Sequence, residues 1–428
     1  MTTVPYASSF SKRMAPTVDR ISSLSNDILH HILDFMPIRE AGRTSVLSKR
    51  WKDVWASTPC LNIFETEMDP IDRSKYEWPA VVDKALLLHK ETIHGFKLHE
   101  PVHPDGHIDG WLRSLCGRGL QDLTIEFFPL HEDNEAERYK IPSFVFACSS
   151  LVSLDLTCCV LRLPSGFKGF KSLKFLSLDR VSLHDTILES LVSGSSHLEH
   201  LNIEECNGLS KIKIQAPSLL YLHIFGDFRN INLNRCNNMK RLSIHLSENS
   251  YRNNDPGRRL GEYLKGLVRL QSLYLHGWSL WYLFKANVPQ RLPLINRNLR
   301  VLDILIDLWE EKDVFAFVCL LKSYPCLEVL AIEAYDDTNR GTEIIGDYWK
   351  MLEHSGPWLG CLRNVGIKNI TGSEHEIQLI GFFLANTREL ENFYVYIEEG
   401  IEHKRRFKIA KLLHKFPRSS NRAKVHIS

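Results

Sequence analysis

The sequence predicts an α/β chain in which three short helices precede a long stack of repeated strand units, closed at its C-terminal end by a small helical module. Two observations support this prediction. A leucine-rich hexamer recurs from residue 120 onward, and the first sixty residues show helical patterning without that hexamer. The length agrees, because 428 residues exceed the usual single-core domain and favour several domains or a repeat.

Composition excludes several classes of protein. Hydrophobic residues make up 44% of the chain and the formal net charge is +2, too small to indicate a nucleic-acid surface or a membrane patch. The N-terminus has no apolar core of a signal peptide, and the longest apolar run, Val314–Leu321, is too short to span a bilayer. We therefore expect a cytoplasmic or nuclear protein whose partners are neither nucleic acid nor membrane, and which needs no cofactor.

Three helices are predicted near the N-terminus. The first should begin after Ser25, a residue type favoured at helix N-caps, and end near Met36, because proline follows. The second fits Arg39–Val46, and the third fits Ser48–Ala56 with the serine at its start as cap. So short a segment cannot bury all its apolar faces internally, so one face should pack on the following chain or receive a partner.

The run from Asp19 to Pro59, with RTSVLSKRWKDVW at Arg43–Trp55, resembles an F-box of the plant type. The resemblance implies docking to a Skp-type adaptor and, through it, to a cullin and a RING subunit. One position departs from the family: Ser25 stands where proline is usual, and we expect serine to cap the helix with weaker docking as the result. The positions that the resemblance assigns to adaptor contact are Leu24, Ser25, Ile28, Leu29, Ile32, Leu33, Val46, Leu47 and Trp51.

A hexamer of the form L-x-x-L-x-L recurs with few breaks through the rest of the chain. Successive starts lie 20 residues apart at the closest (219 to 239) and 35 at the widest (327 to 362). This is the irregular period of leucine-rich repeats, in which each unit supplies one strand and a return segment. The copies are LQDLTI at Leu120, LVSLDL at Leu151, LKFLSL at Leu173, LEHLNI at Leu198, LLYLHI at Leu219, MKRLSI at Met239, LQSLYL at Leu270, LRVLDI at Leu299, LEVLAI at Leu327, LRNVGI at Leu362 and a degenerate LENFYV at Leu390.

Alternate apolar side chains of each strand should point into the stack, and the polar ones between them should line its concave surface. The return segments Asp185–Ser193, Arg258–Gly266 and Asp313–Ser323 should form outer helices. The concave row shows no dominant charge or aromatic stripe, so the sequence leaves open which protein it binds and whether a small-molecule co-ligand takes part. The candidate target-contacting residues are Asp155, Ser177, Asn202, His223, Ser243, Tyr274, Asp303 and Ala331.

The ten cysteines are expected to be reduced. Several should be buried structural thiols and not zinc ligands, since no Cys-x-x-Cys pair occurs. Cys159 and Cys206 each follow a repeat start by eight residues, where this repeat prefers asparagine or cysteine. Four others lie just before a repeat strand: Cys148, Cys236, Cys326 and Cys361.

The string His99-Glu100-Pro101-Val102-His103 matches the zinc-protease pattern H-E-x-x-H, but we expect a loop here. Zinc binding would need both histidines on one face of a continuous helix, which Pro101 would break. The sequence contains no G-x-S-x-G elbow, phosphate-binding loop or dinucleotide fingerprint. The chain is therefore predicted not to be an enzyme, with no catalytic and no metal-binding residues.

The C-terminal segment changes character. Ser373-Glu374-His375-Glu376 predicts a capping box that opens an apolar helix. A strand at Leu390–Ile397, a basic helix at Arg405–His414 and a strand at Ala423–Ile427 should follow. This run resembles the FBD module that closes many plant F-box repeat proteins, and it should cover the open end of the stack. We expect His403–Arg406 to be a solvated basic helix end, with a nuclear-import or acidic-partner patch as the alternative.

These features predict a flexible tail at 1–18, an F-box at 19–60, a leucine-rich-repeat solenoid at 61–355 and an FBD-like module at 356–428. The resemblance implies a substrate-recognition subunit of an SCF-type ubiquitin ligase. In such a ligase the F-box docks the adaptor while the repeats hold a protein target near a charged ubiquitin-conjugating enzyme. The alternative, raised by Ser25, is a non-catalytic repeat scaffold with a vestigial F-box.

Overall fold

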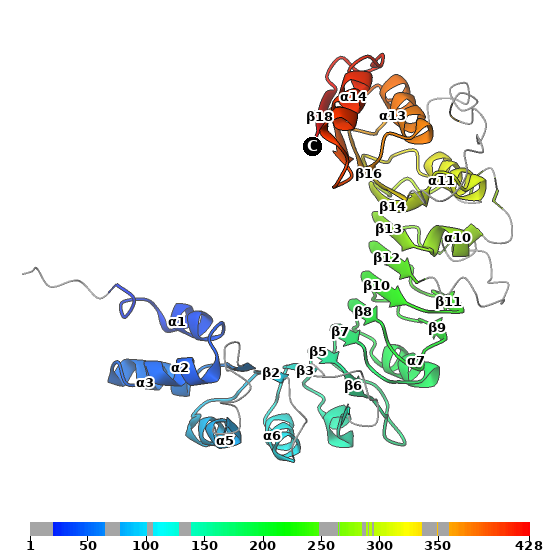
Figure 1. The fold of residues 1–428 in the computed structure, drawn as a ribbon. Coiled ribbons are helices and arrows are strands. Elements are labelled where there is room, and N and C mark those ends of the chain that lie inside the picture. The colour runs from blue at the N-terminus through cyan, green and yellow to red at the C-terminus, as the bar shows by residue number, and fades with distance from the viewer. Residues whose placement is uncertain are drawn as a thin grey trace, which may run out of the picture. The chain divides into compact units, whose positions relative to one another are not determined.

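A computed structural model describes residues 20–64, 78–100, 106–127, 138–247, 264, 266–284, 288–289, 291–292, 295–335, 349 and 359–428. The chain divides into two compact units, Met1–Leu98 and His99–Ser428, and each is considered by itself (Figure 1). The expected tail at 1–18 lies outside the described residues. So does the expected helix at Arg258–Gly266, apart from Leu264 and Gly266.

The first unit contains the three predicted helices. They are α1 (Asn26–Leu33), α2 (Ile38–Thr44) and α3 (Lys49–Ala56). Two of them end early, α1 at Leu33 and α2 at Thr44. In both cases a hydrogen-bonded turn and not further helix continues toward the next element. The unit goes on through β1 (Cys60–Phe64) and α5 (Trp78–Leu88), and β2 (Gly95–Glu100) crosses the division between the units.

The two serines predicted to cap helices behave differently. Ser48 is a working N-cap, since its Oγ accepts a hydrogen bond from the backbone N–H of Trp51 at 3.1 Å. Ser25 has the extended backbone of an N-cap, but its side chain makes no capping hydrogen bond. The prediction that the Ser25 side chain caps α1 is therefore wrong, and this helix begins without that stabilisation.

The second unit is built on one parallel sheet whose strands lie side by side in chain order (Figure 1). Each of the eleven hexamers supplies one strand, beginning at or near its third residue, and β18 adds a further strand after them. The strands are β3 (Asp122–Phe127), β5 (Ser153–Thr157), β7 (Phe175–Asp179), β8 (His200–Glu204), β10 (Tyr221–Gly226), β12 (Arg241–Leu246), β13 (Ser272–Gly277), β14 (Val301–Asp307), β15 (Val329–Tyr335), β16 (Asn364–Ile370), β17 (Asn392–Ile397) and β18 (Lys424–Ile427).

The register of this sheet keeps equivalent leucines side by side. Leu201 pairs with Leu176 on one side and with Leu222 on the other. Ile203 and its partners form a second row, two residues further along each strand. From β3 to β17 both rows are almost completely excluded from solvent, so they form a continuous apolar core of the kind that stabilises repeat proteins.

Short helices and two-stranded ladders return the chain between strands. Two of the predicted outer helices are present, α7 (Asp185–Gly194) and α11 (Glu311–Ser323). The other return elements are α6 (His107–Cys116), η2 (Ser143–Ala147), α10 (Ser279–Phe284), the pair β4 (Tyr139–Lys140) and β6 (Cys159–Val160), and the pair β9 (Lys211–Lys213) and β11 (Asn230–Asn232). Among the described residues, no helix is both long and apolar enough to cross a membrane.

The C-terminal module is part of the same sheet. Its helices are α13 (Glu374–Asn386) and α14 (His403–Leu413), and β18 pairs in parallel with β17. The predicted capping box is confirmed. Ser373 Oγ accepts a hydrogen bond from the Glu376 backbone N–H at 3.4 Å, and the Glu376 carboxylate accepts one from the Ser373 N–H at 2.9 Å. The same buried carboxylate also accepts from Gly372 N–H at 2.7 Å, so it fixes the loop before the helix.

Two smaller predictions need correction. Cys361 is exposed and Cys326 is only half-buried, whereas the other predicted structural thiols are buried. His99 lies in β2 and not in a loop, and its Nδ1 is 2.7 Å from Glu126 Oε2, so this histidine has a carboxylate partner. Pro101 and His103 lie outside the described residues.

Candidate binding surfaces

The first unit carries an exposed apolar face. Val46 is 84% exposed and Leu47 67% exposed, in the turn between α2 and α3. On α1, Ile28 and Ile32 are also exposed. Large apolar side chains exposed together on a folded unit are typical of a surface that binds a partner.

The nine predicted adaptor contacts fall into two groups in the free chain. Ile28, Ile32, Val46 and Leu47 lie on the exposed face, together with exposed Ser25 and half-buried Leu24. The buried group consists of Leu29, Leu33 and Trp51. These three side chains form the core of the helices and support the face from beneath. Two exposed residues were missed by the sequence reading, Ile21 and Phe35. Both extend the apolar patterning at either end of α1.

Arg50 holds the segment before α1 in place, a role that the sequence did not reveal. Its guanidinium donates hydrogen bonds to the carbonyl oxygens of Ser22 and Leu24 and to Asn26 Oδ1. The Trp51 Nε1–H adds a bond to Ser22 Oγ at 3.0 Å. Helix α3 therefore positions the beginning of α1, although these contacts join residues more than twenty positions apart in the sequence.

The second candidate surface is the open face of the parallel sheet in the second unit. The predicted target-contacting residues form one unbroken row across eight strands, because each is paired with the next in register. All are half-buried except Ser177, which is buried. The sheet thus aligns in one row residues that are up to 176 positions apart in the sequence, from Asp155 at one end to Ala331 at the other. The row continues through Gly366 and Tyr394 to His426.

An aromatic stripe runs beside this row, at a strand position that the sequence-based prediction did not consider. The first residues of β7, β8, β10 and β12 are Phe175, His200, Tyr221 and Arg241, and they pair in register. His200 stacks on Tyr221 with ring centroids 4.4 Å apart, and the Arg241 guanidinium lies 5.8 Å from the centre of the Tyr221 ring. We call these four residues and Tyr274 the aromatic ladder. The sequence reading missed it because it considered only the middle position of each strand.

The aromatic ladder borders an open hollow of about 480 Å³ on the face of the sheet. Asn202, His223 and Ser243 of the polar row also line it. Aromatic rings and an arginine in one shallow hollow are the residue types that carry most of the energy at protein–protein interfaces. The hollow is therefore the strongest candidate anchor point on this face.

Most polar side chains of the row are already hydrogen-bonded to one another. His223 Nδ1 lies 2.9 Å from Ser243 Oγ, and the amide of Asn202 donates to Ser177 Oγ at 3.3 Å. Burial lowers the pKa of His223, although Glu204 opposes the shift. Burial raises the pKa of Asp155, and the nearby carboxylates of Glu126 and Asp179 add to that increase. A partner that binds the row must therefore offer hydrogen bonds at least as good as those that these side chains already make with one another.

Comparison with known families identifies both regions. The F-box domain family matches residues 21–62, and the family described as "FBD-associated F-box protein At5g56370, LRR repeats" matches residues 108–332. The chain belongs to the plant F-box/FBD/LRR-repeat family. An F-box implies binding to a Skp-type adaptor, and the match includes the whole exposed apolar face.

Similar proteins of Arabidopsis thaliana agree with this assignment. The F-box/FBD/LRR-repeat protein At1g13570 is 29% identical over 426 residues, which is 96% of this chain and 99% of the relative. F-box/LRR-repeat protein 13 is 25% identical over 95% of this chain and 96% of its own length. F-box protein At5g03100 is 33% identical over 50% of this chain and 66% of its own. Two of these relatives align over nearly their entire length, so the order of F-box and repeats is shared with them.

Proposed function

We propose that this chain is a substrate-recognition subunit of an SCF-type ubiquitin ligase. The observation that carries the proposal is the exposed apolar face of the F-box, on which Val46 is 84% and Leu47 67% exposed. This face docks a Skp-type adaptor, which joins the chain to a cullin and a RING subunit. The open face of the repeat sheet holds a protein target.

F-box/LRR-repeat proteins are non-catalytic ligase adaptors, so the contribution of this chain is proximity. Bringing a target lysine near a charged conjugating enzyme makes the transfer effectively intramolecular, which raises its rate without any catalytic group on the receptor. Docking energy should concentrate in a few apolar anchors of the F-box, each contributing about 2 kcal/mol or more on truncation.

Target binding is proposed for the polar row together with the aromatic ladder. The ladder supports this proposal because Arg241 lies between the rings of Tyr221 and Tyr274, with 5.8 Å and 5.7 Å to their centroids. A guanidinium held in this way presents its remaining donors to a carboxylate or a carbonyl of the target. A scaffold with a vestigial F-box is the second candidate, and the missing Ser25 cap favours it.

The decisive experiment is co-purification of the full chain with a Skp-type adaptor, using charge-introducing double variants. Val46→Asp/Leu47→Asp should abolish binding, because both aspartates would have to be desolvated at the interface. The matched control is Leu87→Asp/Leu88→Asp on α5, where Leu87 is 84% exposed but lies outside the matched F-box. This control should bind as the unmutated chain does. If the folded unmutated chain does not bind the adaptor, the ligase role is wrong and the scaffold remains.

Target engagement has a separate test. Proteins ubiquitinated in cells that express the chain would be compared with those found for Tyr221→Ala/Arg241→Ala and for Phe407→Ala, an exposed aromatic residue of α14 that lies outside the sheet. Loss of the same substrates with the ladder variant, but not with the control, would support the proposed target face. Unchanged substrates with the ladder variant would place the target elsewhere.

A further inference from the structure

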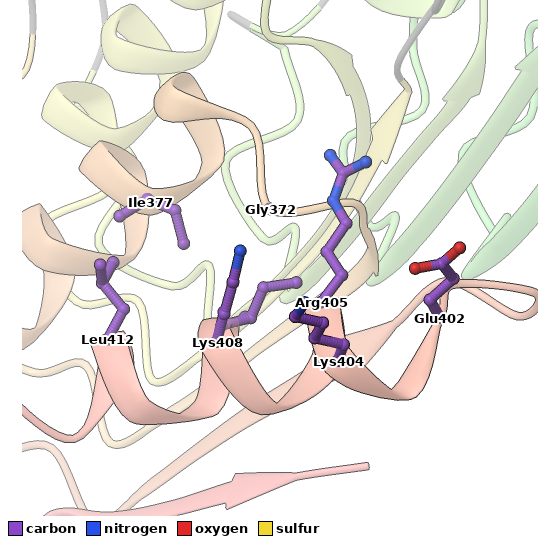
Figure 2. A pocket seen from close by; sticks show the side chains of 8 residues that line it. Gly372, Ile377, Glu402, Lys404, Arg405, Lys408 and Leu412 are labelled. Atoms are coloured by element: carbon purple, nitrogen blue, oxygen red, sulfur yellow. The ribbon is translucent and has the colours of Figure 1, made fainter.

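A groove opens in the C-terminal module, apart from both surfaces described above. It lies between the loop at Gly372, the start of α13 and the exposed side of α14, and has a volume of about 440 Å³ (Figure 2). Its apolar lining comes from Ile377, Ile409 and Leu412. None of its lining residues belongs to a strand of the sheet, so the groove is separate from the polar row and the aromatic ladder.

The close approach of the loop to α14 shapes the groove. Gly372 has φ +86, and a Cβ there would lie 2.8 Å from Ile409 Cδ1. Only glycine therefore fits between the loop and the helix without displacing Ile409. Leu412 is 44% exposed at the far end, so the apolar lining continues to the surface. The result is an accessible apolar channel, fixed at one side by the Glu376 carboxylate that holds the loop.

Three cations of α14 line the groove beside these apolar side chains. They are Lys404, Arg405 and Lys408, and Figure 2 shows the side chains of Arg405 and Lys408 extending from α14 across the groove. Within the described part of the chain none of the three has an ion-pair partner. The groove contains one carboxylate, that of Glu402, which precedes the helix. Three positive charges against one negative charge leave the groove with a net positive charge.

We propose that this groove binds an acidic peptide segment of a partner protein, with an apolar side chain inserted between the flanking carboxylates. Charge complementarity selects the acidic groups, and the aliphatic lining selects the apolar side chain. A phosphate group alone would leave Ile377 and Leu412 uncovered. A nucleic-acid strand would find no aromatic ring among the lining residues on which to stack a base.

The test is fluorescence anisotropy of the full chain with a labelled short peptide that alternates leucine with aspartate or glutamate. Two double variants are compared, Lys404→Glu/Lys408→Glu in the groove, and Lys411→Glu/Lys415→Glu at the end of α14 and in the turn after it, outside the lining. Both change the net charge of the chain equally. We expect the groove variant to bind about tenfold more weakly, as lost contacts of two exposed ion pairs would give, and the control to bind within about twofold of the unmutated chain.

Four further measurements complete the test. A peptide with asparagine and glutamine in place of the acids should bind at least about tenfold more weakly, and Leu412→Ser should weaken the acidic peptide severalfold. Thermal melting of each variant confirms that the fold is kept. Equal weakening by both double variants, or tighter binding of a labelled single-stranded oligonucleotide than of the peptide, would overturn the proposal. No binding of the peptide to the unmutated chain would overturn it as well.

Discussion

The F-box and the polar row of the repeat sheet expose side chains of opposite kinds. The F-box presents large aliphatic and aromatic side chains to solvent, such as Val46 and Phe35. The polar row on the open face of the sheet presents groups that are mostly hydrogen-bonded to neighbouring strands, such as His223 with Ser243. The F-box surface therefore gains free energy when a partner removes its apolar side chains from water. The polar row is already hydrogen-bonded in the free chain.

This difference fits the two proposed roles. An apolar surface binds mainly because its area is removed from water. Its partner must therefore fit its shape but needs few polar groups. A surface of paired polar groups gains little unless the partner reproduces each bond, so it discriminates among partners. The first kind suits a shared adaptor and the second suits a particular target.

The largest expected effect separates support from contact within the F-box. Leu29 is completely buried and Ile28, its neighbour on α1, is about half exposed. Leu29→Ala should lower the local free energy of unfolding of the F-box by about 2–5 kcal/mol, because it leaves a cavity, and Ile28→Ala by less than about 1 kcal/mol. Hydrogen exchange of residues 20–60, measured by mass spectrometry on the full chain, reports both. Similar losses for the two variants would mean that Ile28 also belongs to the core.

A smaller effect is expected where α3 holds the segment before α1. Arg50→Ala removes the hydrogen bonds to Ser22, Leu24 and Asn26, so the start of α1 becomes less ordered in the free chain. Affinity for the adaptor should fall by about 1–2 kcal/mol, since part of the binding energy must then order this segment. Titration calorimetry with the purified adaptor measures the change. Lys49→Ala, on the exposed side of the same helix, is the control, and an equal loss there would argue against a specific role for Arg50.

The two caps give the next comparison. Ser48→Ala should destabilise the F-box by about 1 kcal/mol, because the Trp51 N–H loses its side-chain acceptor. Ser25→Ala should change stability by only a few tenths of a kcal/mol, since its hydroxyl caps nothing. Ser25→Pro restores the residue usual in the family and should strengthen adaptor binding, because proline fixes the backbone at the start of a helix. Hydrogen exchange and calorimetry measure the two effects. A Ser25→Ala cost equal to that of Ser48 would show that Ser25 does cap α1 in solution.

The sequence predicted the strands better than the surfaces they make. Period-two alternation and repeat spacing specify each strand and its buried leucines, because one face must be buried and a shift of one residue would expose it. The same alternation placed Asp155 and Tyr274 in one row. It did not reveal the aromatic ladder, since Tyr221 and Arg241 meet only when separate repeats are stacked. Nor did it separate Leu29 from Ile28, because helical patterning shows which side of α1 is apolar but not which residues a partner would cover.

The smallest expected effect tests whether polar side chains on the open face of the sheet are hydrogen-bonded to one another in solution. His276 Nε2 lies 3.1 Å from Asp303 Oδ1, and this hydrogen bond raises the pKa of His276, with Glu333 adding to the increase. A folded-state pKa above the unfolded value of about 6.5 means that the pair contributes its full stability below that pH. The contribution disappears as pH rises through the folded pKa.

His276→Gln should therefore destabilise the chain more at about pH 6 than at about pH 8.5. The losses in free energy of unfolding, obtained from thermal melting at the two pH values, should differ by about a few tenths of a kcal/mol because the pair is partly exposed. Burial lowers the pKa of His245, whose titration acts in the opposite sense, so the informative quantity is the difference between His276→Gln and the unmutated chain at each pH. Asp303→Asn should remove the same pH dependence. If the difference is constant with pH, His276 and Asp303 do not form this pair in solution. Their polar groups would then be available to a target, and the contrast with the F-box face would weaken at this position.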